Sequence, residues 1–411
     1  MADQALDGVR VVEITDEAGA YCGRLLADLG AEVIKIEAPG GGLERHTPPY
    51  FHGQENPDNS LAFWIHNTSK KSVVLNLDTP DDQAAARQLA LGADILIEDR
   101  PVGYLASRGL GYDELAAEKP SLIYCSITGF GQTGPHAAFA FSDIVGQAMS
   151  GYMTLAGDPN DPPNRIVGNQ SYKSACVHAV QATLAALLHA EATGEGQAID
   201  TSAQESGSMN QETAMQTWDL QKRNRVRTGP LGMLPLQLPA TGVYETSDGH
   251  IMSFVLAPAA PTAPELINWM RESNMHGDLD EEPYASLIGQ LNMAFITQAM
   301  GDPNAASGVI PQLQHINEQV AAFFKTLGAV EAYETGQRRN LLIGLCSTPE
   351  DLGHNAQLRE RDWFVKFQVN GETTEFPGAP YRLSATPVVI NRPPRLGEHT
   401  DEILAALGQA Q

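Results

Sequence analysis

Basic residues are few in this chain of 411 residues, and no apolar run in it is long enough to span a membrane. The chain carries 26 Lys and Arg residues against 50 Asp and Glu residues, which gives a net charge of −24. This charge repels phosphate backbones and anionic lipid surfaces. We therefore expect neither a nucleic acid nor a membrane as a partner.

Cysteine is also scarce. The four cysteines, Cys22, Cys125, Cys176 and Cys346, are scattered and form no CxxC pair, which argues against a disulfide framework and against a zinc site. None of the 11 histidines has HExxH or another ligand spacing, so we expect no metal. The N-terminal sequence lacks the basic and then apolar pattern of a secretory signal, and we predict a cytoplasmic protein.

Short apolar segments alternate with helical patterns in the first part of the chain. This alternation predicts a parallel sheet with helices on both faces, in the nucleotide-binding class of α/β domains. The predicted strands are residues 9–14, 32–37, 70–77, 93–99 and 121–128, with predicted helices over 19–30 and 79–93.

An alanine-rich segment organises the middle of the chain. Residues 162–197 predict a polar loop, a long helix and a glycine turn, with Gly194 and Gly196 ending the helix. No Asp or Glu occurs between Asp161 and Glu191. Further on, we predict helix over 198–224, a hairpin over 242–256, helices within 257–345, a second hairpin with an Asn370-Gly371 turn, and a last helix at 401–407.

The segment GFGQTG follows the predicted strand 121–128 and has glycines at Gly129, Gly131 and Gly134. A dinucleotide fingerprint also needs a helix that opens at these glycines. Because Pro135 follows at once and residues 136–141 form no clear amphipathic helix, we expect no NAD. A glycine loop that faces the substrate is the better interpretation.

Four polar residues at or before the alanine-rich helix resemble catalytic residues only in part. Ser171, Tyr172 and Lys173 form neither an SxxK nor a GxSxG motif, and we interpret Lys173 as a residue at a helix start. Asp143 precedes an apolar segment, and we predict that it is the N-cap of a helix there.

Taken together, several segments resemble the family III CoA-transferases, which include formyl-CoA transferase, carnitine CoA-transferase and the α-methylacyl-CoA racemases. They occur in the family's order over nearly the whole chain: LDGVRVVEIT, LADLGAEVIKIEAPGGG, SVVLNL, ITGFGQTGP, SDIVGQAMSGYMTLAG, TGEGQAID and LGEHTDEIL. The resemblance implies an α/β fold, with a Rossmann-like large domain and a smaller α+β domain, in a ring-shaped chain that forms an interlocked dimer. It places the CoA-binding large domain at residues 1–200, a linker helix at 201–224, the small domain at 225–330, and a return to the large domain at 331–411.

The resemblance implies CoA exchange between an acyl-CoA thioester and a carboxylic acid, with coenzyme A as part of the substrate. In the family's transferases an aspartate attacks the thioester and forms a mixed anhydride. That aspartate corresponds here to Ser171, Tyr172 or Lys173, so this chain has no carboxylate at the position. The histidine of the racemases corresponds to Ser142.

These departures predict the nucleophile-lacking subunit of a heteromer, as in the benzylsuccinate CoA-transferases, with a homologous partner that carries the aspartate. Family arginines that bind CoA correspond here to Ala38 and to Ser107, which Arg108 follows. Each lost charge-assisted contact is worth roughly 1.5–3 kcal/mol. The CoA contacts that the resemblance still implies are Glu17, Ala18, Leu75, Asp99, Arg100, Arg108, Gly129 and Gly131.

Two alternatives remain open. One is a CoA-thioester isomerase or lyase that works by proton transfer, with Lys173, Tyr172 or Asp143 as acid or base. The other is a paralogue without catalysis. The acyl group and the acceptor acid are not predicted.

Overall fold

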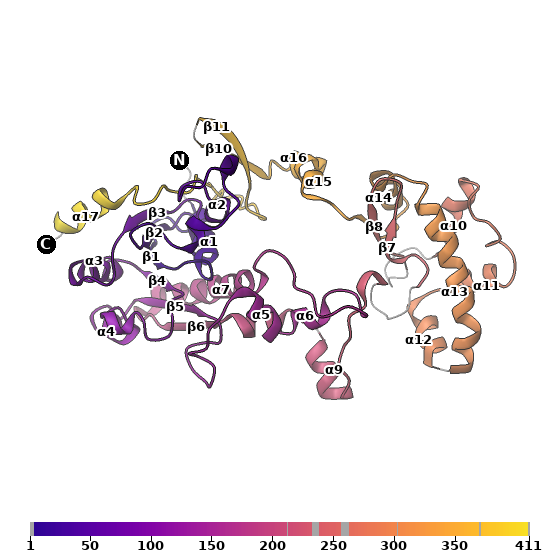
Figure 1. Cartoon of the computed structure of the whole chain (residues 1–411), viewed down its shortest axis with the longest axis horizontal. Helices are drawn as coiled ribbons and strands as arrows, with labels where there is room; N and C mark the ends of the chain where they lie inside the picture. Colours follow the sequence, from indigo (N-terminus) through magenta and orange to yellow (C-terminus); the bar gives the residue numbers. More distant parts are fainter. Residues whose placement is uncertain are drawn as a thin grey trace. The chain divides into compact units, whose positions relative to one another are not determined.

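The computed structural model describes residues 4–211, 213–231, 238–255, 263–301, 303–369 and 371–409 (Figure 1). The chain forms two compact units. Unit 1 consists of Met1–Met153, Arg165–Asn224 and Ala356–Gln411, and unit 2 of Thr154–Asn164 and Arg225–Asn355.

A six-stranded parallel sheet is the centre of unit 1, and it confirms the predicted α/β class. Its order is β3-β2-β1-β4-β5-β6. At its middle, Val12 pairs with Ile34 on one side and with Leu96 on the other. The strands are β1 (Arg10–Ile14), β2 (Glu32–Glu37), β3 (Lys71–Val74), β4 (Ile95–Glu98), β5 (Ile123–Thr128) and β6 (Ala198–Ser202).

The prediction of helix over residues 198–224 is wrong at its start. Residues 198–202 form β6, in which Ile199 pairs with Cys125 of β5. Without this strand the outer edge of β5 would leave its backbone groups unpaired, and this tertiary need outweighs the local sequence pattern. Two helices then follow, α8 (Ala203–Met209) and α9 (Ala214–Gln221).

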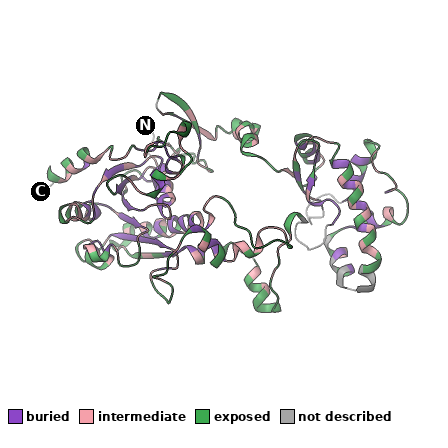
Figure 2. Cartoon of the chain, viewed as in Figure 1, coloured by how far each residue is buried: buried purple, intermediate pink, exposed green. Residues whose placement is uncertain are grey.

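Helices cover both faces of the sheet, and the strands between them are buried (Figure 2). On one face, α1 (Ala20–Asp28) and α7 (Gln170–Thr193) pack through residues that include Leu26 and Ala179. On the other, α3 (Pro80–Leu91), α4 (Tyr112–Glu118) and α17 (Thr400–Gln409) pack through residues that include Leu89, Leu115 and Ile403.

The alanine-rich helix forms as predicted. Helix α7 starts after Asn169, which adopts a left-handed φ of 56°, and ends at Gly194, whose φ of 79° suits a residue without Cβ. Ala175, Ala179 and Ala186 are buried against the sheet core, and their small side chains allow this 24-residue helix to lie close to it.

Smaller elements complete unit 1. The hairpin of β10 (Phe364–Val369) and β11 (Glu372–Pro377) packs on α2 (Leu61–His66) in one aromatic cluster. Asn370 of the predicted turn lies outside the described residues, and Gly371 has a φ of 87°. The remaining elements are η1 (Leu43–His46), η2 (Phe51–Gly53), η3 (Ala106–Arg108), α5 (Asp143–Met149) and α16 (Ala356–Glu360). Helix α6 (Tyr152–Leu155) spans the boundary at which the chain passes from unit 1 to unit 2.

Unit 2 has its own core beneath a three-stranded antiparallel sheet, β7-β8-β9, and includes the hairpin predicted over 242–256. Its elements are η4 (Gly229–Leu231), β7 (Thr241–Glu245), β8 (His250–Phe254), α10 (Ala263–Glu272), α11 (Tyr284–Gln290), α12 (Met293–Gly301), α13 (Pro303–Phe324), α14 (Ala329–Arg338), β9 (Ile343–Leu345) and α15 (Pro349–His354). In the described part of the chain, no helix is both long and apolar enough to cross a membrane.

Candidate functional site

At the carboxyl end of the parallel sheet, the loops after β1, β4 and β5 lie close to the start of α7. The loop after β1 contains Glu17 and Ala18, and the loop after β4 contains Asp99 and Arg100. Asp99 Oδ2 joins these loops because it accepts hydrogen bonds from the backbone N–H groups of Asp16 (2.7 Å) and of Gly19 (3.0 Å). This edge is where α/β proteins bind ligands.

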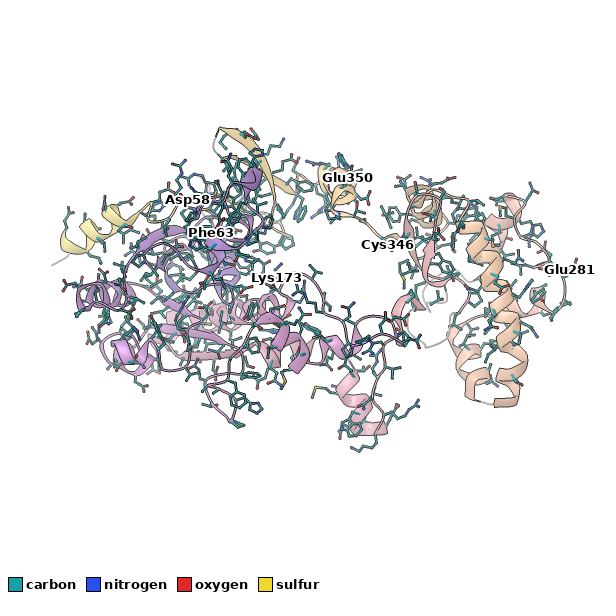
Figure 3. The ribbon with its side chains drawn as sticks, in the orientation of Figure 1. Asp58, Phe63, Lys173, Glu281, Cys346 and Glu350 are labelled. Carbon is teal, nitrogen blue, oxygen red and sulfur yellow. The ribbon has the colours of Figure 1, made fainter. Side chains whose placement is uncertain are left out.

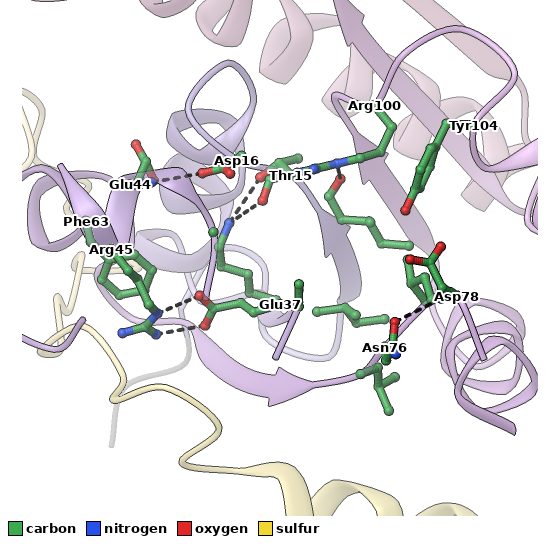
Figure 4. Close-up of a pocket in the computed structure, with 17 residues that line it drawn as sticks. Thr15, Asp16, Glu37, Glu44, Arg45, Phe63, Asn76, Asp78, Arg100 and Tyr104 are labelled. Atoms are coloured by element: carbon green, nitrogen blue, oxygen red, sulfur yellow. Dashed lines mark hydrogen bonds and ion pairs between the residues drawn. The ribbon is translucent and has the colours of Figure 1, made fainter. Parts of the chain in front are cut away.

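One cavity at this edge, the nucleotide-side cavity, lies beside β1, β2 and β3 and measures about 120 Å³ (Figure 4). Leu75 and Arg100, both predicted CoA contacts, line it. Arg108 does not line it but contacts two residues that do: its guanidinium lies 3.7 Å from the Tyr104 ring centre and pairs with Asp78 at 2.6 Å.

The cations that line the nucleotide-side cavity all have carboxylate partners within the described residues. Arg45 donates to both carboxylate oxygens of Glu37, at 2.6 and 2.8 Å. Lys35 pairs with Glu13 at 2.8 Å, and Arg100 pairs with Asp99 at 3.1 Å. A bound phosphate would therefore have to compete with carboxylates that are already in place.

A second cavity, the apolar cavity, measures about 400 Å³ and lies at the ends of β4 and β5. It contains four of the predicted CoA contacts and one residue of the nucleophile position. Its lining is Ala18, Asp99, Arg100, Pro101, Val102, Ile127, Thr128, Gly129, Ala137, Ala138, Phe139, Ala140, Phe141 and Tyr172. Arg100 lines both cavities.

The glycines of GFGQTG have separate structural roles. A Cβ on Gly129 would lie 2.1 Å from Cγ of Phe141, so glycine lets the Phe141 ring pack on the end of β5. Gly131 has a φ of 85° and lies near Asp200, and it is not among the residues that line either cavity. No helix opens at these glycines, since α5 begins only at Asp143, and the geometry of a dinucleotide fingerprint is not formed.

The prediction that Asp143 is an N-cap is wrong. Ser142 is the N-cap of α5, and the Asp143 carboxylate instead caps α7. Asp143 Oδ1 accepts from the backbone N–H of Ser171 (2.9 Å) and from its hydroxyl (2.7 Å), while Oδ2 accepts from Gln147 (2.7 Å). The first N–H groups of a helix lack partners within it, which explains the attraction of a carboxylate from another element.

The other two residues of the nucleophile position differ in their surroundings. Tyr172 is 8% exposed and packs 5.9 Å from Phe141 between ring centres. Burial, and then the charge of Glu17, raises the pKa of Tyr172, so its phenol stays neutral. Lys173, which is labelled in Figure 3, is half-buried, and burial, and then Arg24, lowers its pKa. No hydrogen bond or ion pair of Lys173 Nζ occurs within the described residues.

Glu17 lies close to the nucleophile position, and one of its two carboxylate oxygens has no partner among the described residues. Its Oε1 accepts a hydrogen bond of 2.5 Å from Asn169 Nδ2, and Oε2 has no partner in the described part of the chain. Burial raises the pKa of Glu17. Both oxygens of Asp99, and both of Asp143, are engaged.

The sequence predicted Glu17 as a CoA contact and not as an acid or base. The sequence shows a carboxylate directly before Ala18-Gly19, but it does not show whether the two oxygens of Glu17 have partners. Among the residues that the structure describes, no group of three or more His, Cys, Asp or Glu is placed to hold a metal ion.

The model of CoA-transferase family III matches residues 6–400. The chain is 32% identical to the succinyl-CoA:(R)-benzylsuccinate CoA-transferase subunit BbsE of Thauera aromatica, over 97% of this chain and 93% of that protein. It is 31% identical to the succinate–glutarate CoA-transferase of Agrobacterium fabrum, over 98% of this chain and 95% of that protein.

Solved structures resemble the chain over its whole length. A CAIB/BAIF family protein from Brucella suis is 26% identical and superposes with a TM-score of 0.82, over 98% of this chain and all of that protein. Rv3272 from Mycobacterium tuberculosis is 25% identical, with a TM-score of 0.74 over the same share of each chain.

Proposed function

Because the chain belongs to CoA-transferase family III and is a CoA-transferase, we propose that it acts as the subunit without the nucleophilic aspartate in a heteromer. The complex exchanges CoA between an acyl-CoA thioester and a carboxylic acid. One observation supports the subunit role above all others. The position that corresponds to the family's nucleophile offers no carboxylate, and two of its three residues, Ser171 and Tyr172, are buried.

The relatives support the substrate class. The names of the two proteins compared over nearly their full length refer to succinyl-CoA with benzylsuccinate, and to succinate with glutarate. The first of them is itself named as a subunit. We propose dicarboxylic acids as the substrates exchanged by the complex, and an interlocked dimer with the partner as its assembly.

The CoA site that we propose follows the edge of the sheet. Leu75, Arg100 and Arg108 would hold the nucleotide end of CoA at the nucleotide-side cavity. Ala18, Asp99 and Gly129 would line the path of the thioester end, with Glu17 beside it and Gly131 in the same loop as Gly129. The partner's aspartate would attack the thioester carbonyl carbon, form a mixed anhydride and release the CoA thiolate. The thiolate would attack the aspartyl carbonyl of the anhydride, which releases the donor acid and leaves an aspartyl-CoA thioester. The acceptor carboxylate would attack that thioester and release the thiolate again, and the thiolate would then attack the acceptor's carbonyl in the second anhydride, which gives the new acyl-CoA and restores the aspartate.

Free cysteines support our further proposal of a cytoplasmic location. Cys22, Cys125 and Cys176 are buried as unpaired thiols, and Cys346 is unpaired at the surface. Unpaired thiols are typical of a reducing compartment.

Expression with and without a partner tests the subunit role. We expect no transfer from succinyl-CoA to glutarate by the purified chain alone. We expect turnover when the chain is co-expressed with a family member that carries the aspartate. Mutation gives an asymmetric test. Replacing the aspartate in the partner abolishes activity, whereas Lys173→Gln, at the corresponding position of this chain, leaves the chemical step in place. Sustained transfer by the chain alone would refute the subunit role.

A second candidate function, proton transfer on a CoA thioester, is favoured by Glu17. Its half-buried carboxylate has a raised pKa and one unengaged oxygen, which suits an acid or base. Asp143 and Tyr172 suit the role less well, since the first is fully engaged and the second stays protonated. Incubating the chain with an acyl-CoA in D₂O tests this candidate. Deuterium at the α-carbon that Glu17→Gln abolishes would support it, and no exchange would eliminate it.

A further inference from the structure

The apolar cavity has the lining of a ligand pocket rather than of a packing defect. Its volume of about 400 Å³ falls in the range of small-molecule sites, and its position at the carboxyl ends of β4 and β5 is a usual ligand position in parallel sheets. Most of its walls are apolar. Three of its alanines, Ala137, Ala138 and Ala140, lie in one loop and leave the space between the larger side chains empty.

Aromatic rings form one side of this cavity. Phe141 lies 5.0 Å from Phe130 with the planes at 87°, and 5.9 Å from Tyr172. Phe139, which is 60% exposed, stacks on His136 at 4.7 Å. Phe139, Phe141 and Tyr172 all line the cavity, and a further aromatic ring that lies about 4.5–7 Å from any of them would form a stable aromatic pair.

One donor of Arg100 has no partner in the described part of the chain. Arg100 donates through Nε to the Ile14 carbonyl and pairs through Nη2 with Asp99, which leaves Nη1 without a partner among the described residues. Thr128 also lines the cavity, but its hydroxyl oxygen is itself buried and is not open to a ligand there. Nη1 is therefore a donor that the cavity wall offers to an acyl group.

The position of Arg100 connects this cavity to the nucleotide-side cavity, since the same side chain lines both. A CoA thioester whose nucleotide end lies in the nucleotide-side cavity would therefore place its acyl end in the apolar cavity. Glu17 lies in the β1 loop between Asp16, which lines the first cavity, and Ala18, which lines the second.

We propose that the apolar cavity binds the acyl group of a CoA thioester that carries an aromatic ring. The ring lies against Phe139, Phe141 and Tyr172. Arg100 Nη1 holds a carboxylate where the acyl group has one. This inference rests on the proposed CoA-transferase function and names the substrate class that this chain recognises.

Direct binding to the full-length chain tests the inference without requiring turnover. Calorimetry with CoA, acetyl-CoA and phenylacetyl-CoA separates the nucleotide end from the acyl group. Because the phenyl ring buries apolar surface that the acetyl group lacks, we expect phenylacetyl-CoA to bind at least about tenfold more tightly than acetyl-CoA. Ala140→Trp fills the cavity from an exposed loop position and should remove this preference while the affinity for CoA itself stays the same.

Two further variants keep the test independent of how Ala140→Trp folds. Phe139→Ala removes an exposed ring from the cavity wall and should reduce the preference for phenylacetyl-CoA over acetyl-CoA, while the affinity for CoA stays the same. Leu188→Ala is the matched control, because Leu188 is 69% exposed on α7 and does not line the cavity. It should leave all three affinities unchanged.

The outcomes separate this inference from the function on which it rests. If CoA and both thioesters bind equally well, the CoA site stands and the aromatic acyl pocket is refuted. If none of the three binds, the proposed CoA site on this chain fails first. If Ala140→Trp changes the oligomeric state and leaves the acyl preference intact, the cavity is a contact surface between chains, and the inference is overturned.

Discussion

Glu98 is a buried carboxylate directly before Asp99 and Arg100, and it makes the stability of unit 1 depend on pH. It is 5% exposed at the end of β4, and its Oε2 accepts a hydrogen bond of 2.6 Å from the backbone N–H of Arg100. Burial raises the pKa of Glu98 to about 7. Hydrogen bonds from the Ser126 side chain and from the Arg100 backbone lower the pKa, but their effect is smaller than that of burial. In the unfolded chain its pKa is 4.5.

The free energy of unfolding follows from this difference. The folded state binds the proton more tightly, so Glu98 costs nothing below pH 4.5, and its cost grows as the pH rises to about 7. Above pH 7 the full cost is about 3 kcal/mol. Glu98→Gln removes the charge and keeps an amide oxygen for the Arg100 N–H. We therefore expect the variant to be about 3 kcal/mol more stable at pH 8, and equal to the parent at pH 4.

This effect is measured by urea unfolding of the full-length chain. Hydrogen exchange is followed in the proteolytic peptide that contains β4, so that the signal reports on unit 1. The local readout is needed because the chain has two units, and a signal from the whole chain would mix their transitions. Glu195→Gln, at an exposed position of the same unit, is the control and should change stability by less than about 0.5 kcal/mol at either pH. A gain of equal size at pH 4 and pH 8, or no gain at pH 8, would refute the reasoning.

Further predictions concern the start of α7, the glycine loop and the nucleotide-side cavity. Ser171→Ala removes the 2.7 Å hydrogen bond from the Ser171 hydroxyl to the Asp143 carboxylate and should cost about 2 kcal/mol in urea unfolding; an unchanged midpoint would contradict a stabilising role of this hydroxyl. Gly129→Ala should cost about 1–3 kcal/mol because its Cβ overlaps Phe141, and Phe141→Ala in the same chain should recover much of that loss in thermal unfolding. Arg108→Ala should lower CoA affinity about tenfold in calorimetry, and an effect that persists unchanged in 1 M salt would rule out a phosphate contact.

Most of the architecture could be predicted because its signals are local. The strands from β1 to β5 are short apolar runs between helical patterns, and Gly194 ends α7 through a backbone angle that glycine adopts without strain. β6 was missed, because residues 198–202 become a strand only through the free edge of β5, which no local pattern records.

The site was predictable in its composition but not in its pairings. The absence of a carboxylate at positions 171–173 is visible in the sequence. The engagement of Asp143 by Ser171, 28 residues away, is not, and it turned a predicted N-cap of α5 into a cap of α7. Glu17 is a similar case. Its partner Asn169 is distant in the sequence, so the sequence does not show which oxygen of the Glu17 carboxylate is engaged.

The central claim is that this CoA-transferase chain lacks the nucleophile of the reaction. An acyl-transfer assay with succinyl-CoA and glutarate tests it most directly, on the purified chain alone and on the chain co-expressed with an aspartate-bearing family member. We predict no product from the chain alone and turnover from the pair. Turnover by the chain alone, with the same rate after the partner is added, would contradict the claim.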